Sequence, residues 1–128
     1  MYRFPSGIVI GPGSVLVIAY DGTQVPQANF QMCQNCGGIA PVLAKYAAWG
    51  QNGDWTLRGA GDQVLLLGPN DIPVDVVVYG DATYPGVVAH PGVSVYTHSL
   101  ERFPANRDTD NCAADFRDRY PPTPGKVP

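Results

Sequence analysis

The segment Gly61–Gly80 constrains the fold of this chain more than any other stretch. It reads GDQVLLLGPNDIPVDVVVYG, in which two apolar runs, QVLLL and VDVVVYG, flank the turn residues Gly68-Pro69-Asn70-Asp71. Short β-branched runs separated by Gly, Pro, Asn and Asp are typical of an antiparallel hairpin. We therefore expect two paired strands joined by a loop of about five residues.

Other segments also indicate strands. Ser14–Tyr20 (SVLVIAY) is almost wholly apolar and bounded by turn signals, which predicts a strand buried on both faces. MYRF and GIVI, on either side of Pro5-Ser6-Gly7, are expected to be short strand pieces, and Gly92–His98 a further strand. Only Ile39–Trp49 has helical spacing, with Pro41 suited to a first turn, and a short helix and an irregular loop both remain open there.

Strands without alternating helices predict an all-β sandwich or barrel, here with an irregular insertion and at most one short helix. The 15 Gly and 13 Pro agree with short strands joined by turns. Alternation along the strands identifies the expected core. Its members are Val15, Val17, Leu65, Leu67, Val76 and Val78.

Length and charge restrict the function. A chain of 128 residues fits one domain, which we expect over residues 1–120, with 121–128 as a Pro-rich tail or linker. The net charge is −3 and no segment gathers Lys and Arg, which argues against nucleic-acid binding. No apolar run approaches the roughly 18 residues of a membrane span, and the first residues do not have the pattern of a signal peptide.

The segment Ser99–Phe116 (SLERFPANRDTDNCAADF) concentrates charge around one cysteine. We interpret it as a polar clamp, in which Asn111 caps a short turn through Ala113 to Phe116. The arginines are expected to pair with the nearby aspartates, and three apolar side chains to face inward. The arginines are Arg102, Arg107 and Arg117, the aspartates Asp108, Asp110 and Asp115, and the apolar residues Leu100, Phe103 and Phe116.

The start of Asp108-x-Asp110-Asn111 also resembles a calcium loop, in which oxygen ligands alternate along a turn. An EF-hand needs an oxygen ligand, a Gly and a Glu at its fifth, sixth and twelfth positions. These positions are Cys112, Ala113 and Arg119, so the EF-hand is excluded. A different calcium site using Asp108 and Asp110 with backbone oxygens is a minor alternative to the turn.

Cys33-x-x-Cys36 is half of a zinc site, and Cys112, His90 and His98 are the residues that could complete it. A second close pair of ligands is missing, and a redox CxxC lacks its βαβ setting. A disulfide in an exported protein fits better, with one thiol left over. Pairing of Cys112 with Cys33 or Cys36 is slightly preferred over a Cys33–Cys36 bridge.

Catalysis has little support in the sequence. His90 and His98 lie near Ser94, Ser99 and Asp81, but neither serine stands in a nucleophile elbow. The aromatic residues could form a carbohydrate platform, although large rings more commonly fill a core and its rim. They are Trp49, Trp55, Tyr79, Tyr84 and Tyr96.

Four ordered segments resemble the bacterial and archaeal members of the lamin tail domain family. They are YRFPSGIVIGPGSVLVIA, LRGAGDQVLLLGPNDIPVDVVVYGD, SLERFPANRDTDNCAADF and PPTPG. The likeness covers most of the chain, but Gln24–Gly50 matches loosely. Two features depart from the family pattern: the CxxC, and the missing strands with which family members usually begin.

The resemblance implies an immunoglobulin-like β-sandwich and a non-catalytic interaction module, an accessory domain of a larger secreted or surface protein. A metal-stabilised module with zinc or calcium, or a fragment of a hydrolase whose catalytic part lies elsewhere, is the alternative. Because the missing strands would leave an uncovered edge, we also expect a homodimer or larger assembly that buries Tyr2–Ile10.

Overall fold

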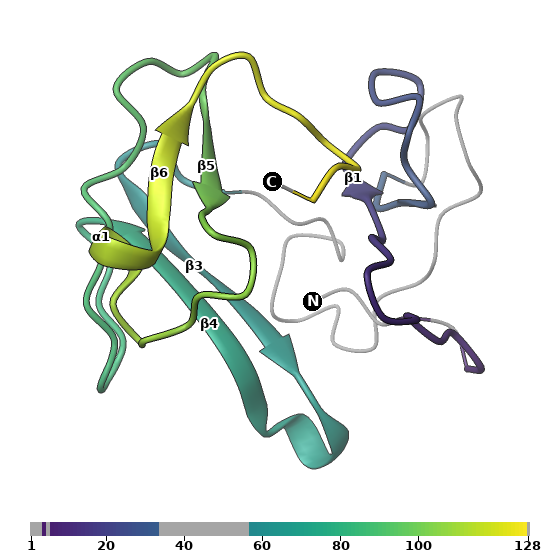
Figure 1. Cartoon of the computed structure of the whole chain (residues 1–128), viewed down its shortest axis with the longest axis horizontal. Helices are drawn as coiled ribbons and strands as arrows, with labels where there is room; N and C mark the ends of the chain where they lie inside the picture. The colour runs from purple at the N-terminus through teal and green to yellow at the C-terminus, as the bar shows by residue number, and fades with distance from the viewer. Residues whose placement is uncertain (1–3, 5, 34–56, 128) are drawn as a thin grey trace. The chain divides into compact units, whose positions relative to one another are not determined.

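The computed structural model describes Phe4 and residues 6–33 and 57–127 (Figure 1). The chain divides into two compact units, Met1–Thr56 with Thr123–Val127, and Leu57–Pro122. The described residues are rich in β-structure and contain one short α-helix, which confirms a β-rich chain. No helix among them is long and apolar enough to cross a membrane.

The predicted hairpin dominates the second unit. Strands β3 (Gly61–Leu67) and β4 (Pro73–Gly80) pair antiparallel, and the loop between them has the expected five residues, 68–72. The loop contains the short 3₁₀ turn η3 (Pro69–Asp71). Asn70 and Asp71 take φ angles of 61° and 60°, a left-handed conformation that Asn and Asp tolerate best after Gly.

Glycine is required at the open end of this hairpin. Gly80 has a φ of 64°, and a Cβ there would collide with the carbonyl oxygen of Ala60. The backbone N–H of the next residue, Asp81, donates to the same carbonyl at 3.0 Å. The chain therefore crosses Ala60 too closely for any side chain at position 80.

A second strand pair and the helix complete this unit. Strands β5 (Ser99–Arg102) and β6 (Phe116–Arg119) pair antiparallel, and helix α1 (Cys112–Asp115) runs directly into β6 (Figure 1). The Asn111 side chain accepts a hydrogen bond from the Ala114 N–H at 3.1 Å, which confirms the predicted cap.

The first unit contains a short parallel pair, β1 (Ile18–Ala19) and β2 (Phe30–Gln31). Gln31 is fully buried, and its side-chain amide is satisfied on both sides. It accepts from the Gly22 N–H at 2.9 Å and donates to the Cys33 carbonyl at 2.8 Å. A buried amide with both functions paired is stable where an unpaired one would be costly.

Several predicted strands are wrong. Ser14–Tyr20 contributes only the two residues of β1, and neither GIVI nor Gly92–His98 forms a strand. Gly92–His98 folds into turns, one of them closed by a 2.8 Å hydrogen bond from the His98 N–H to the Val95 carbonyl. Apolar composition favours a strand only where a neighbouring strand is present to pair with it. The predicted helix at Ile39–Trp49 lies outside the described residues.

The predicted core is also partly wrong. Val78 is fully buried, and Val17, Leu67 and Val76 are half-buried. Val15 and Leu65 are instead 39% and 37% exposed. Each sheet among the described residues has only two strands, so part of each face meets solvent.

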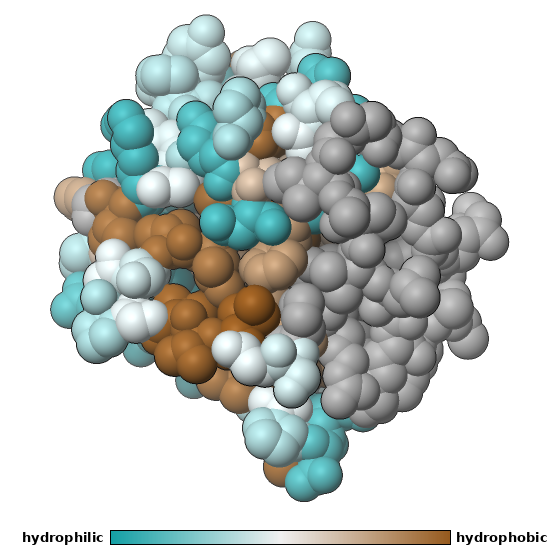
Figure 2. Space-filling model, turned by 90° about the vertical axis from the view of Figure 1, so that its right-hand side faces the viewer, coloured by the Kyte–Doolittle hydropathy of each residue, from teal (hydrophilic) through white to brown (hydrophobic). Residues whose placement is uncertain are grey.

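Apolar side chains are also exposed near the start of the first unit. Apolar surface is visible on the face of the molecule shown in Figure 2. Ile8, Val9 and Ile10 are 41%, 84% and 56% exposed. This amount of exposed aliphatic surface in consecutive residues is unfavourable in water.

Candidate functional site

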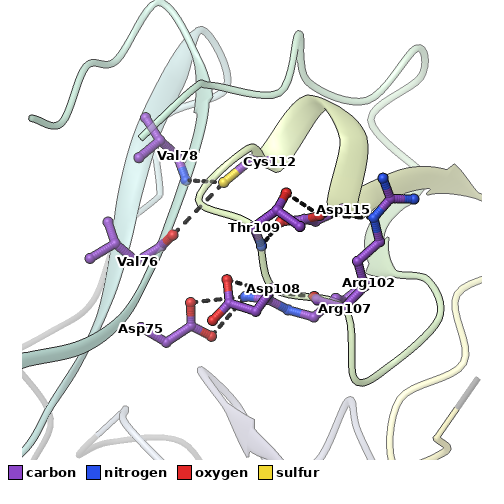
Figure 3. A network of polar contacts seen from close by, with 9 residues as sticks. All are labelled: Asp75, Val76, Val78, Arg102, Arg107, Asp108, Thr109, Cys112 and Asp115. Atoms are coloured by element: carbon purple, nitrogen blue, oxygen red, sulfur yellow. Dashed lines mark hydrogen bonds and ion pairs between the residues drawn. The ribbon is translucent and has the colours of Figure 1, made fainter. Parts of the chain in front are cut away.

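Arg102, on β5, is the centre of a network that joins three parts of the second unit (Figure 3). Its Nη2 donates to both carboxylate oxygens of Asp75 on β4, at 2.9 and 2.7 Å. Its Nη1 donates to the Arg107 carbonyl at 2.7 Å and lies 3.1 Å from Oδ1 of Asp108. The guanidinium also stacks over the Phe116 ring, with its carbon 4.7 Å from the centroid.

This arrangement makes Arg102 a structural residue. Its side chain is only 17% exposed. Burial alone lowers the pKa of Arg102, but the hydrogen bonds and charges of Asp108 and Asp75 outweigh it and raise the pKa. The guanidinium is held by bidentate, charge-assisted contacts and has little freedom to engage a ligand.

Asp115, on α1, forms the second half of the network. Its side chain is 2% exposed and accepts from the Thr109 N–H at 2.8 Å and the Thr109 hydroxyl at 2.9 Å. The Arg107 Nε lies 3.1 Å from its Oδ1. Burial raises the pKa of Asp115, but the contacts from Thr109 and the charge of Arg107 prevail and lower it. Asp115 therefore remains ionised and fixes the loop that leads into α1.

Two of the three arginines pair with aspartates of this segment, as expected: Arg102 with Asp108 and Arg107 with Asp115. Arg117 instead pairs with Glu101, its Nη2 lying 2.6 Å from Oε2. Phe103 was expected to face inward but is 45% exposed, and the Arg117 guanidinium covers its ring at 3.6 Å. A ring covered by a cation is stabilised without being buried.

Cys112 connects this network to the hairpin. Its Sγ accepts a hydrogen bond from the Val78 N–H at 3.4 Å and lies 3.8 Å from the Val76 carbonyl (Figure 3). Cys112 is a free, buried thiol, so the predicted disulfide between Cys112 and Cys33 or Cys36 is wrong. Cys33 is disulfide-bonded, and Cys36 lies outside the described residues.

The calcium and zinc candidates do not come together. Asn111 uses its side-chain oxygen to cap α1, and Asp108 pairs with Arg102. Within the described ranges, no three His, Cys, Asp or Glu side chains group as a metal site would require. His90 accepts from the Gly92 N–H at 3.0 Å through Nδ1.

Ser94, His98 and Asp118 form a cluster that superficially resembles a catalytic triad. His98 Nδ1 lies 2.6 Å from Asp118 Oδ1 and 3.4 Å from Ser94 Oγ. A triad needs the serine on one ring nitrogen and the carboxylate on the other. Because both groups meet the same nitrogen, His98 cannot accept a proton from Ser94 at one ring nitrogen while Asp118 orients it through the other.

The cluster instead anchors the loop before β5. The Ser94 N–H donates to Asp118 Oδ2 at 2.7 Å, and the His98 ring stacks on Tyr120 with centroids 5.1 Å apart. The Ser94 hydroxyl and N–H, together with His98, lower the pKa of Asp118 to about 2. Sequence reasoning named Ser99 and Asp81 here and missed Asp118, which lies 20 residues from His98.

A hollow of about 230 Å³ lies beside the start of β4, and its lining combines apolar and acidic side chains. It is lined by Pro73, Val74, Asp75, Val76, Tyr84, Pro85, Gly86, Val87, Asp108 and Asp110. Two of its three carboxylates, those of Asp75 and Asp108, contact Arg102. The third, Asp110, is exposed, and no ion pair within the described part of the chain involves it.

Comparison of the chain with protein-family models, curated proteins and solved structures gives no match. The lamin tail resemblance thus remains a prediction.

The aromatic residues considered for a carbohydrate-binding platform do not form a common surface in the part of the chain that the structure describes. Tyr79 donates its hydroxyl to the Arg58 carbonyl at 2.8 Å, Tyr84 lines the hollow, and Tyr96 is 93% exposed. Trp49 and Trp55 lie outside the described residues.

Proposed function

We propose that this chain is a non-catalytic interaction module that binds a protein partner through the hollow beside β4. The observation that carries the proposal is the contrast in how the acidic side chains are used. Asp75, Asp108, Asp115 and Asp118 are bound to partners inside the second unit, whereas Asp110 faces the hollow without an ion pair among the described residues.

An extracellular setting is part of the proposal. The disulfide at Cys33 supports it, because disulfides persist mainly in oxidising compartments. The role of an accessory domain in a larger secreted or surface protein, with the immunoglobulin-like sandwich of the lamin tail family, is proposed on the sequence resemblance. The β-rich strand content is compatible with it.

Selection from a random peptide library displayed on phage tests the binding function. Val74 lines the hollow and is 65% exposed, while Ile72 is 62% exposed and lies outside it on the same hairpin. Val74→Lys and Ile72→Lys therefore add the same charge to similarly exposed positions. We expect one peptide motif to be enriched by the wild-type chain and by Ile72→Lys, and lost with Val74→Lys. Absence of any motif, or equal enrichment by Val74→Lys, contradicts the proposal.

Self-association through the N-terminal apolar segment is a second proposal, supported by the exposure of Ile8, Val9 and Ile10. Val9→Asp places a charge in that segment, and Tyr96→Asp is the control because Tyr96 is exposed elsewhere. Light scattering should give an assembly for the wild type and for Tyr96→Asp, and a monomer for Val9→Asp. A monomeric wild type at micromolar concentration contradicts it.

A further inference from the structure

Among the residues that the structure describes, the outer edge of β4, away from β3, has partners along only part of its length. The Gly80 N–H donates to the His90 carbonyl at 2.8 Å, and the His90 N–H donates to the Val78 carbonyl at 2.9 Å. The Val78 N–H on the same edge donates to Cys112 Sγ. The backbone groups of residues 78 and 80 thus point away from β3.

The backbone of Val76 points to this same edge, because alternate residues of an antiparallel strand face the same side. Its carbonyl accepts a weak hydrogen bond from the Cys112 thiol at 3.8 Å, so the N–H is the group of Val76 left for a further partner on this edge. Its N–H has no acceptor among the residues that the structure describes. Val76 also lines the hollow, so an unpaired strand donor borders a space that a ligand can enter.

Backbone hydrogen bonds fix the segments that lie beside this edge of β4. The Cys112 N–H donates to the Val88 carbonyl at 2.8 Å, and the Val88 N–H donates to the Asp110 carbonyl at 2.9 Å. Cys112 thereby separates β4 from the segment at Val88. An open strand edge between fixed walls is the geometry in which an extended peptide adds as a further strand.

The lining indicates the charge of the occupant. Asp75, Asp108 and Asp110 contribute three carboxylates, and Arg102 is the cation that contacts two of them. The remaining negative charge favours a Lys or Arg side chain, and the prolines, valines and Tyr84 suit its aliphatic stem and apolar neighbours. A hollow of about 230 Å³ holds one such side chain better than a larger organic ligand, whose pockets start at about 300 Å³.

We propose that the hollow receives an extended peptide segment of a partner protein, which adds to the outer edge of β4 at Val76 and places a lysine or arginine beside Asp110. This inference rests on the proposed interaction function and specifies the partner's chemistry.

The test is a nuclear magnetic resonance titration of the full ¹⁵N-labelled chain. The probes are the N-acetylated, C-amidated peptides Thr-Val-Lys-Val-Thr and Thr-Val-Glu-Val-Thr. We expect the lysine peptide to shift the amide signals of Val76 and Asp110 at up to millimolar concentration, and the glutamate peptide to leave them unchanged. Equal shifts with both peptides, or no shift at Val76, overturn the inference.

Two charge-matched variants separate a specific contact from general attraction. Asp110→Asn should weaken binding of the lysine peptide about two- to fivefold, the range for one exposed ion pair. Asp71→Asn, in the hairpin loop outside the hollow, should leave the affinity unchanged. Equal weakening in both variants overturns the inference.

The result can be separated from that of the phage selection. If selection enriches a motif that depends on Val74 while the lysine peptide does not bind, the interaction function stands and this inference fails. If neither experiment gives binding, both fail.

Discussion

The hairpin β3–β4 and the segment Ser99–Arg119 belong to the same unit but are stabilised in different ways. The hairpin is the most apolar stretch of the second unit, yet Leu65 and Leu66 are 37% and 50% exposed. The later segment is highly charged, yet it contributes the buried Cys112 and Asp115. Hydrophobicity along the sequence therefore does not tell which residues stabilise this unit, because several of its buried contacts are polar and depend on specific partners.

The largest effect should come from Asp115→Asn. The variant removes the charge that faces Arg107 and replaces an acceptor of the Thr109 hydrogen bonds with an amide. We expect the Tm to fall by about 10 °C, measured by circular dichroism. The exposed Asp110→Asn should change it by less than about 2 °C. Equal Tm values for the two variants would show that the buried carboxylate does not support the fold.

Arg102→Lys should have the next largest effect. Lysine lacks the planar fork that holds Asp75 and the Arg107 carbonyl together, and it stacks less well on Phe116. The free energy of unfolding should fall by about 2 kcal/mol in denaturant titration, below the range for a fully buried pair because Asp75 is partly exposed.

Arg58→Lys is the control for Arg102→Lys. Arg58 pairs with Asp81, and both side chains are more than 60% exposed. Its cost should be below about 0.5 kcal/mol, as for other surface pairs. If Arg58→Lys lowered the free energy of unfolding as much as Arg102→Lys, burial of the ion pair would not explain the larger effect expected at Arg102.

Acid should release the loop that Asp118 anchors. The pKa of Asp118 is lowered to about 2 in the folded chain, so the folded state binds fewer protons than the unfolded state between that value and the ordinary pKa of about 4. This contribution to stability is complete above about pH 4 and disappears as the pH falls through about 2. Asp118→Asn should flatten the pH dependence of the Tm in this window, and an unchanged profile would contradict the assignment.

The smallest effect should come from Leu66→Thr in the hairpin. Leu66 is half exposed and threonine keeps a high strand propensity, so the free energy of unfolding should change by less than about 0.5 kcal/mol. A loss of more than about 2 kcal/mol would mean that an apolar layer covers this face of the hairpin.

The sequence predicted the features of the fold that depend on residues close together in the chain. The hairpin and the Asn111 cap follow from turn and capping preferences acting over a few residues. Arginines of this segment were expected to pair with its aspartates, and the two such pairs observed, Arg102–Asp108 and Arg107–Asp115, are also close in sequence.

Contacts between distant residues were not predictable in the same way. No sequence pattern joins Arg102 to Asp75 across 27 positions, or Cys112 to Val78 across 34. Asp75, a partner in the first of these contacts, lines the hollow. Gly92–His98 was misassigned because its valines suit a strand, while hydrogen bonds of Ser94 and His98 to Asp118 fix it as turns.

Native-state hydrogen exchange of the full chain, read at single amides by nuclear magnetic resonance, tests most directly whether side chains secure the backbone while one strand edge stays open. The Thr109 N–H bonds to Asp115 and the Val78 N–H to Cys112, so both should be protected. The Val76 N–H should exchange much faster than that of Val78, although both face the same edge of β4. Equal protection of Val76 and Val78 would show that the edge is already covered, and rapid exchange at Thr109 would show that Asp115 does not hold the loop.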